Sequence, residues 1–210
     1  MLERKQQGAT IIPVIISSDR TQVTQFGSKS AYPLYLTIGN LPKHIHRKPS
    51  HRGQTLLAYL PTSKLKHIPN AASRRRCLAN IFHSCLRHIL SPLEKLGLQG
   101  TKMRSGDGVI RRVHPILAVY IGDYPEQLLV AGVKSGECPK CMIGSKELGS
   151  IITPLQNRNI TSVLRAFEMA ESDPCRFLAA CEALKIKPLY HPFWQDLPLG
   201  SHQHIPVDYA

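Results

Sequence analysis

Long apolar segments are missing from this sequence of 210 residues. No run approaches the roughly 18 to 20 apolar residues that a membrane span needs, and the opening "MLERKQQGAT" has no apolar signal core. We therefore expect no membrane partner, no secretion and an intracellular location. Internal repeats and low-complexity segments are absent as well, whereas a hydrophobic fraction of 42% is enough for a folded core. The length suits one large domain or two small ones.

Acidic residues are scarce. Asp and Glu number 14 against 27 Lys and Arg, so the formal net charge is +13 and the isoelectric point is near 9.7. Such a charge attracts polyanions, of which nucleic acid is the first candidate and an anionic membrane surface the second. The alternative is that the charge only keeps the protein soluble, because the basic residues are spread along the chain.

Cysteine is uncommon, with six residues. Cys138 and Cys141, in "GECPKCMIG", have the spacing of metal ligands. A structural zinc site requires four ligands, and the other candidates are His191, His202 and His204. A pair of reduced thiols at a turn is the alternative, and it remains open. The other four cysteines fall in apolar helical patterns and are predicted to be core thiols: Cys77, Cys85, Cys175 and Cys181.

Hydrophobic periodicity predicts an α/β protein. Short apolar runs rich in β-branched residues indicate strands at 11–17, 31–40, 54–61 and 113–122. A helical period indicates helices at 73–90, with Ser73 as its cap, and at 125–133, 159–171 and 172–186. The glycine-rich stretch 96–112 is predicted to be a turn or a short hairpin. Arginines 74–76 crowd the end of their helix that disfavours cations, which indicates either an anionic partner or tolerance on a solvated face.

Two of the predicted strands end at an aspartate. "IISSDRTQVT" leads from a strand into Asp19, and "VHPILAVYIGDYPEQ" leads from another into Asp123. In an open mixed sheet these two strands can be neighbours, and carboxylates at their ends could then share divalent cations. Oxygen ligands suit Mg²⁺ or Mn²⁺, and paired cations of this kind serve phosphoryl transfer. The alternative is that each aspartate is an ordinary turn or cap residue.

Long ordered strings of this sequence resemble the transposase of fungal Plavaka elements, which are relatives of the CACTA (En/Spm) transposons. The resemblance begins at "PVIISSDRTQVTQFGSKSAYPLYLTIGNLPKHIHRKPSHRGQTLLAYLP". It continues through "HPILAVYIGDYPEQLLVAG", "CPKC" and "HPFWQDLP", and so covers nearly the whole chain. It implies a ribonuclease-H-like fold, a mixed sheet with flanking helices, that carries a DDE triad. By this likeness Asp19 matches the first acidic position and Asp123 the second.

The sequence departs from the family near its end. There, the segment after the "HPFWQDLP" region leads into a proline-aspartate-x-leucine-histidine motif, whereas here it reads "IPVDYA". Asp208 matches the aspartate of that motif, and the family's third acid lies further on. Glu168, Glu171 and Glu182 fall in patterned helices and are interpreted as solvated carboxylates. The resemblance therefore implies a truncated catalytic core, with the first two acidic positions in residues 1–135 and a helical insertion containing the CxxC pair in residues 136–210.

The function that this resemblance implies is metal-dependent DNA cleavage and strand transfer. The DNA partners would be transposon ends and target DNA, and the location would be the nucleus. We expect the chain to be inactive alone, and homo-oligomers are expected only of a full-length enzyme. The alternative is a non-catalytic, basic DNA-binding protein derived from a transposase. Two basic connections are predicted to contact DNA phosphates: Lys43, Arg47, Lys48 and Arg52 in the first, and Arg104, Arg111 and Arg112 in the second.

Overall fold

A mixed sheet forms the centre of the molecule. The computed structural model describes residues 9–25, 29–46, 48–150, 156–198 and 207–208. The strands of the sheet occur in the order β5-β4-β1-β7-β6, and β8 also pairs with β7. Their bounds are β1 Thr10–Ser18, β4 Pro33–Ile38, β5 Thr55–Tyr59, β6 Thr101–Arg104, β7 Ile110–Ile121 and β8 Val207–Asp208. The strands predicted at 11–17, 31–40, 54–61 and 113–122 are therefore confirmed as β1, β4, β5 and β7.

Strand direction divides the sheet into two halves. β1 is antiparallel to β4, and β4 is antiparallel to β5, so the first half is a meander. β1 is parallel to β7, which is parallel to β8 and antiparallel to β6. The long helix α3 (Ala71–Gln99) provides the crossover from β5 toward the β6–β7 hairpin. The predicted neighbourhood of the first and fourth strands is thus confirmed.

Short elements connect these strands. β2 (Thr21–Gln22) and β3 (Ser30–Ala31) form a separate two-stranded ribbon that extends from the end of β1. α2 (Lys43–His46) and the 3₁₀ helix η1 (Pro49–His51) lie between β4 and β5. After β7 come α4 (Tyr124–Val130), η2 (Ser145–Glu147), α5 (Ile160–Glu168) and α6 (Pro174–Ala183). Among the described residues, no helix is both long and apolar enough to span a membrane.

Helix α3 is longer than its sequence pattern predicts. Its N-cap is Asn70, whose side chain accepts the N–H groups of Ala72 and Ser73 at 2.9 Å each, so the prediction of Ser73 as the cap is wrong. The helix also continues past Pro92, which cannot donate to the carbonyl of His88. The hydroxyl of Ser91 donates to that carbonyl instead, at 3.0 Å, which removes part of the penalty.

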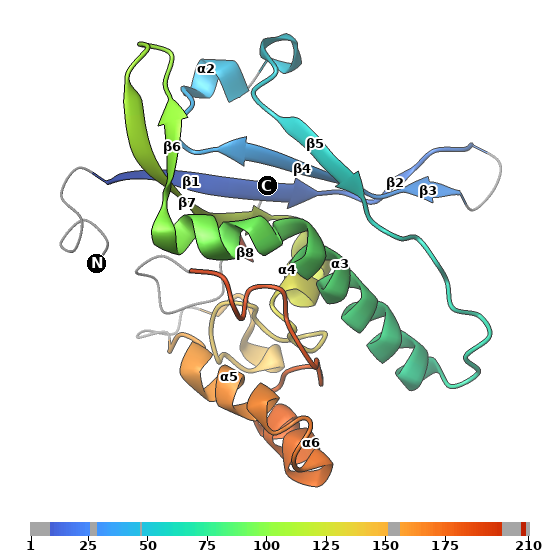
Figure 1. The fold of residues 1–210 in the computed structure, drawn as a ribbon. Coiled ribbons are helices and arrows are strands. Elements are labelled where there is room, and N and C mark those ends of the chain that lie inside the picture. The colour runs from blue at the N-terminus through green and yellow to red at the C-terminus, as the bar shows by residue number, and fades with distance from the viewer. Residues whose placement is uncertain (1–8, 26–28, 47, 151–155, 199–206, 209–210) are drawn as a thin grey trace.

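The core lies between the sheet and the helices on one side of it. Alternate residues of β1, namely Val14, Ile16 and Ser18, are buried, as the two-residue period of a strand requires. Phe82 of α3 contacts the ring of Tyr120 on β7. In Figure 1, α5 and α6 lie on the same side of the sheet as α3 and further from it. One hydrophobic cluster includes residues from both sides of position 135, and the predicted division of the chain there stays a prediction.

Half of the predicted core thiols are on the surface. Cys181 is buried and Cys85 is half-buried, but Cys77 and Cys175 are exposed, so the prediction is wrong for those two. Cys77 lies near the start of α3, where the helix has not yet reached the core: its first buried residue is Ala79. Cys175 is in the first turn of α6, whose buried residues are Phe177 and Cys181.

Candidate functional site

The ends of β1 and β7 lie side by side. These strands are parallel, and their register pairs Ser17 with Ile121 at the carboxyl end. Asp19 and Asp123 each follow two residues later. Two aspartates that the sequence separates by about half the chain are therefore at equivalent positions on adjacent strands. Both are exposed, as groups that meet a solvated ligand must be.

Asp123 also begins helix α4. Its side chain accepts the N–H of Glu126 at 2.9 Å, and Pro125 occupies a favoured position in the first turn. The cap prediction and the site prediction are therefore compatible for this residue, since a carboxylate has a second oxygen that the cap leaves available. Asp19 lies between β1 and the β2–β3 ribbon, at the point where the chain leaves the sheet.

A buried carboxylate lies directly behind this pair. Glu126 is 8% exposed, and its Oε1 accepts the hydroxyls of Ser18 and of Tyr32, the latter at 2.6 Å. Tyr120 lies 3.4 Å from the same oxygen and 2.5 Å from the Ser18 hydroxyl. We call these residues the Glu126 cluster: Ser18, Tyr32, Tyr120 and Glu126. Next to the two aspartates, the cluster connects β1, β7 and α4 with Tyr32, the residue before β4.

Burial dominates the electrostatics of the Glu126 cluster. It raises the pKa of the Glu126 carboxyl, and the hydrogen bonds from Ser18 and Tyr32 only partly oppose this effect. Burial likewise raises the pKa of both tyrosines, and the adjacent Glu126 adds to the effect. The tyrosines therefore stay protonated and act as hydrogen-bond donors.

Sequence reasoning missed the Glu126 cluster. The only local signal was Asp123 followed three residues later by Glu126, the spacing of a capping box in which the glutamate would reach back toward the cap. In the structure the side chain of Glu126 turns into the core instead. Its three hydroxyl partners come from positions 18, 32 and 120, which no local pattern connects.

The two predicted basic connections differ in their surroundings. Lys43, Lys48 and Arg52 are exposed, and Arg47 lies outside the described residues. In the β6–β7 hairpin, Arg104 is exposed, but Arg112 donates to the carbonyl of Gln99 at 3.1 Å. Arg111, the third arginine of this connection, is paired within the hairpin. The second connection is therefore only partly available to a ligand.

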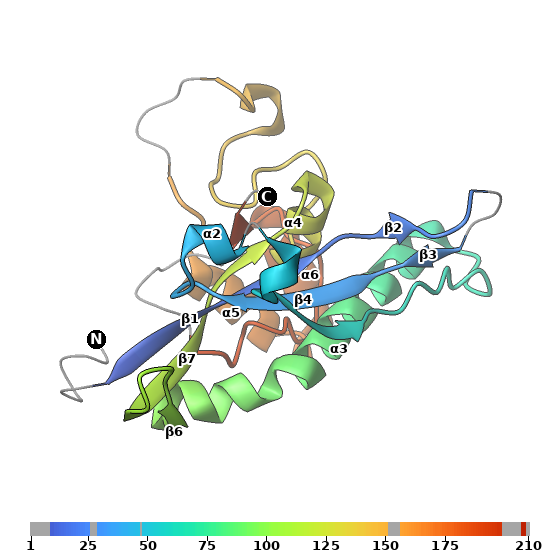
Figure 2. The ribbon, with the colours of Figure 1, turned by 90° about the horizontal axis from the view of Figure 1, so that it is seen from above.

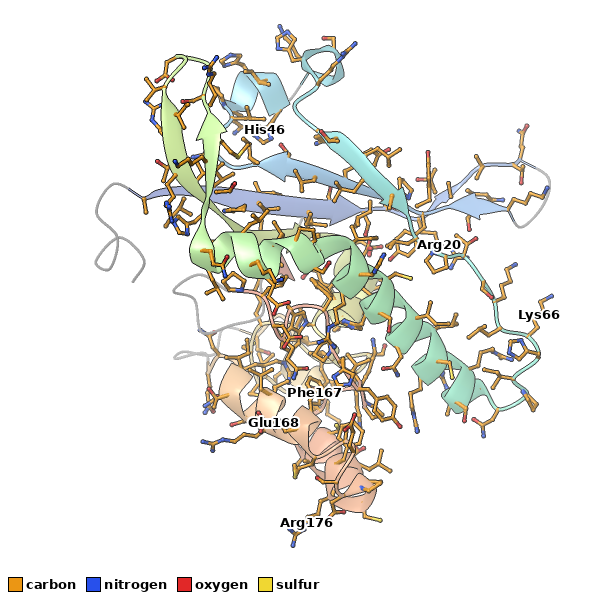
Figure 3. The ribbon with its side chains drawn as sticks, in the orientation of Figure 1. Arg20, His46, Lys66, Phe167, Glu168 and Arg176 are labelled. Carbon is orange, nitrogen blue, oxygen red and sulfur yellow. The ribbon has the colours of Figure 1, made fainter. Side chains whose placement is uncertain are left out.

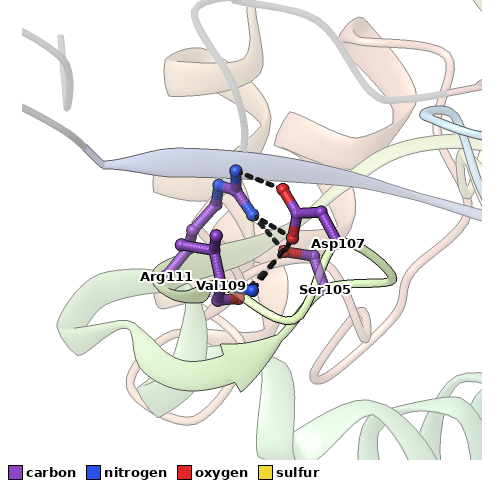
Figure 4. Close-up of polar contacts among 4 residues, drawn as sticks. All are labelled: Ser105, Asp107, Val109 and Arg111. Atoms are coloured by element: carbon purple, nitrogen blue, oxygen red, sulfur yellow. Dashed lines mark hydrogen bonds and ion pairs between the residues drawn. The ribbon is translucent and has the colours of Figure 1, made fainter.

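That pairing joins Arg111 to Asp107. The two terminal nitrogens of the Arg111 guanidinium donate to the two carboxylate oxygens of Asp107 at 2.9 and 2.7 Å (Figure 4). Hydrogen bonds from Arg111, from the Ser105 hydroxyl and from the Val109 N–H hold the pKa of Asp107 well below its usual range. The ion pair is exposed, so it shapes the turn more than it stabilises the fold.

The CxxC pair forms a compact turn. The N–H of Cys141 points at the sulfur of Cys138, 3.4 Å away. The backbone of Cys141 also forms an isolated antiparallel β-bridge with Asn157. The buried Arg158 donates to the carbonyl of Cys138 at 2.8 Å and so braces the turn. In the part of the chain that the structure describes, no group of three or more His, Cys, Asp or Glu side chains could hold a metal ion. His202 and His204 lie outside those residues, and zinc binding stays a prediction.

The residues at the strand ends suit a hard cation only in part. Two exposed carboxylates are oxygen ligands of the type that Mg²⁺ and Mn²⁺ prefer, and Mg²⁺ commonly keeps several waters. Asp208 lies in β8, whose backbone pairs it with Ile121 on the other side of β7 from β1. Aspartates thus occur at or near the carboxyl ends of three neighbouring parallel strands. The exposed Glu182 lies on α6, and the exposed Glu168 lies on α5 (Figure 3), as the sequence predicted.

Comparison with known proteins identifies one family. A family model described as Plavaka transposase matches residues 1–208, nearly the whole chain. No curated protein matches the sequence.

Proposed function

The chain belongs to the Plavaka transposase family, and from this premise we propose that it is the catalytic core of a DDE-type DNA transposase, in which Asp19 and Asp123 are the first two acidic ligands of Mg²⁺ or Mn²⁺. One observation carries the proposal: the parallel register of β1 and β7 brings both aspartates to equivalent positions at one edge of the sheet. A third acid is expected to be supplied by a residue other than Glu168, Glu171 and Glu182.

The topology supports a ribonuclease-H-like core. An antiparallel meander of three strands is followed by a long helix, and the next long strand returns parallel to β1 on its other side. β8 then adds a further parallel strand beyond β7. This is the arrangement in which the family resemblance places the first two acids, at the ends of the first strand and of the parallel strand beside it.

The protein's own residues divide the work at this site. Asp19 and Asp123 offer carboxylate oxygens, and the Glu126 cluster fixes the strand ends that carry them. A divalent cation bound there would neutralise charge on a phosphodiester and polarise it. Asp123 is held through its cap bond to the N–H of Glu126, so its orientation follows that of α4.

Metal binding tests the proposal. Asp123→Asn removes one charge but keeps a side chain that caps helices well. We expect it to weaken Mn²⁺ binding at least about tenfold, with little change in stability, because only the ligand charge is lost. Titration of Mn²⁺ followed by electron paramagnetic resonance measures the free ion. Glu168→Gln, an exposed carboxylate on α5, is the matched control. Equal Mn²⁺ affinity in all three proteins would refute the acidic site.

The net charge of +13 favours a second candidate function, non-catalytic DNA binding in the nucleus by a transposase-derived protein. Phosphate contacts make affinity fall steeply with salt and carry little sequence information. DNA binding without any Mn²⁺ site would favour this candidate over the first.

A further inference from the structure

Acidic residues are missing from one continuous third of the chain. Residues 20–93 contain 12 Lys and Arg and no Asp or Glu, whereas the rest of the chain contains 15 Lys and Arg and 14 Asp and Glu. The acid-free segment therefore carries +12 of the net charge of +13. The basic residues are spread along the sequence, but the excess of positive charge is not.

The fold keeps this charge together. The acid-free segment forms β4 and β5, the two strands on one side of β1, together with the β2–β3 ribbon, α2, η1 and most of α3. Its first residue, Arg20, directly follows Asp19. Figure 3 places Arg20, His46 and Lys66 on three different parts of this side, away from α5 and α6.

Strand β5 runs between two basic ends. It is the edge strand of the sheet, preceded by Arg52 and followed by a loop that begins the approach to α3. Leu56 and Tyr59 are exposed along it, and the strand itself contains no acidic residue. Five residues of strand span about 17 Å, a length over which duplex DNA presents about ten phosphate charges.

The loop 60–70 and the start of α3 form the second basic end, which we call the α3 arm. Its exposed cations are Lys64, Lys66, Arg75 and Arg76. The arm extends outward from the sheet in both Figure 1 and Figure 2, and no residue of α3 before Ala79 is buried. These arginines therefore serve no packing role, although they occupy the helix end where cations are unfavourable.

Only one of the described cations of the acid-free segment has an acidic partner. In the described part of the chain, the one ion pair made from this segment joins Arg87 to Asp196. Arg74 and Arg75 instead donate to backbone carbonyls, those of Ile68 and Ala71. The contrast with the β6–β7 hairpin is clear, because there Asp107 already neutralises Arg111.

We propose that the edge of the sheet from α2 and η1 along β5 to the α3 arm is the surface on which this protein binds the phosphate backbone of duplex DNA. The proposal rests on the proposed function, which supplies DNA as the partner. It adds where the duplex lies: along the β5 side and past Asp19, rather than on the β6–β7 hairpin. Because only phosphates are contacted, this surface positions DNA without selecting its sequence.

Two variants with the same net charge test the location. The first replaces the four cations of the α3 arm with glutamine: Lys64, Lys66, Arg75 and Arg76. The second replaces four exposed cations outside the acid-free segment with glutamine: Lys95, Lys102, Lys146 and Arg165. Fluorescence anisotropy with a labelled duplex of about 30 base pairs, from about 50 to about 200 mM salt, gives the affinity and its salt dependence for each protein.

We expect the arm variant to bind at least about tenfold more weakly than the wild type at about 100 mM salt, with a smaller slope of log affinity against log salt by about 3 to 4. The second variant is expected to stay within about threefold of the wild type. A third variant, Lys43→Gln with Lys48→Gln, removes charge at the other end of β5 and is expected to weaken binding too. Circular dichroism melts verify that each variant is folded.

The outcomes separate this inference from the proposed function. Equal losses of DNA affinity in the arm variant and the second variant would show that only net charge matters. That result would overturn the proposed binding surface but leave DNA as the partner. A wild-type protein that does not bind duplex at low salt would overturn both. Stronger binding to vesicles of anionic lipid than to duplex at the same salt would overturn the assignment to DNA.

Discussion

At the scale of single residues, the most unusual feature is a carboxylate buried among hydroxyls. Glu126 accepts hydrogen bonds from Ser18 and Tyr32 and lies near the hydroxyl of Tyr120. A charged group is expensive to bury, and the raised pKa of Glu126 reflects that cost. Removing the carboxylate, however, leaves several buried hydroxyls without their acceptor, which is costly in its own right.

Glu126→Ala is therefore expected to lower the free energy of unfolding by about 2 to 4 kcal/mol. Glu126→Gln keeps one acceptor oxygen and should lose less than half as much. Urea denaturation measures both. Glu168→Ala, the same change at an exposed helical position, should cost less than about 0.5 kcal/mol. A loss in Glu126→Ala no greater than that control would mean that the cluster does not hold the strand ends.

The buried His83 is expected to make the folded protein less stable in acid. The ring is 1% exposed, with Nε2 3.0 Å from the carbonyl of Leu129, and burial lowers its pKa from 6.5 to about 4. As the pH falls, His83 therefore takes up a proton near pH 6.5 in the unfolded chain but only near pH 4 in the folded protein. Stability contributed by the neutral ring is complete above about pH 6.5 and falls as the pH drops toward 4, by up to about 3 kcal/mol.

Thermal and urea unfolding between pH 7 and pH 4 measure this contribution. His83→Gln should flatten the pH dependence, whereas His88→Gln, on an exposed position of the same helix, should leave it unchanged. The buried Glu126 acts in the opposite direction, because a raised carboxyl pKa favours the folded protein at low pH. Identical slopes in the two histidine variants would contradict the role of His83.

At the scale of elements, helix α3 shows where a periodic pattern locates a helix but not its ends. The apolar stripe predicted the middle of the helix correctly. The pattern indicated a helix only as far as residue 90, whereas the helix continues past Pro92, and Ser91 satisfies the carbonyl that Pro92 leaves free. The start was assigned to Ser73 because serine caps helices well, although Asn70 does so equally well and stands before two alanines.

The two cap assignments predict opposite results. Asn70→Ala removes the acceptor of two backbone N–H groups and should destabilise the protein by about 1 kcal/mol. Ser73→Ala lies inside the first turn, where alanine is the better helix former, and should be neutral or slightly stabilising. Paired urea titrations decide between them. Destabilisation by Ser73→Ala alone would return the cap to the position that the sequence pattern favoured.

At the scale of the whole molecule, the sequence predicted the strands and the adjacency of β1 and β7, because each strand is a short apolar run and a parallel neighbour is a common outcome of a long crossover. It could not predict the Glu126 cluster, whose members come from β1, β7, α4 and the residue before β4. It also could not reveal which cations stay free. Arg111 and Arg75 have the same charge, but only the fold shows that Asp107 pairs with the first and that no described acid reaches the second.

The charge distribution and the acidic pair together predict binding without catalysis. Residues 20–93 carry nearly all of the net positive charge, and Asp19 and Asp123, at the strand ends, are the two proposed metal ligands. A two-metal site usually needs a further acidic ligand to hold the second cation and align the attacking group, and misalignment alone can cost several kcal/mol of barrier. Glu168 and Glu182 are exposed on α5 and α6 and are interpreted as solvated carboxylates, not as this further ligand.

We therefore expect the 210-residue chain to bind duplex DNA but not to cleave it with Mg²⁺ or Mn²⁺. The measurement is nicking of supercoiled plasmid by the wild type and by the Asp19→Asn, Asp123→Asn double variant, which separates site-dependent cleavage from contaminating nuclease. Equal, background nicking in both proteins is the expected result. Metal-dependent cleavage that the double variant lacks would show that the chain already holds a third ligand. Asp208, on the strand beside β7, is then the residue whose change to asparagine should abolish it.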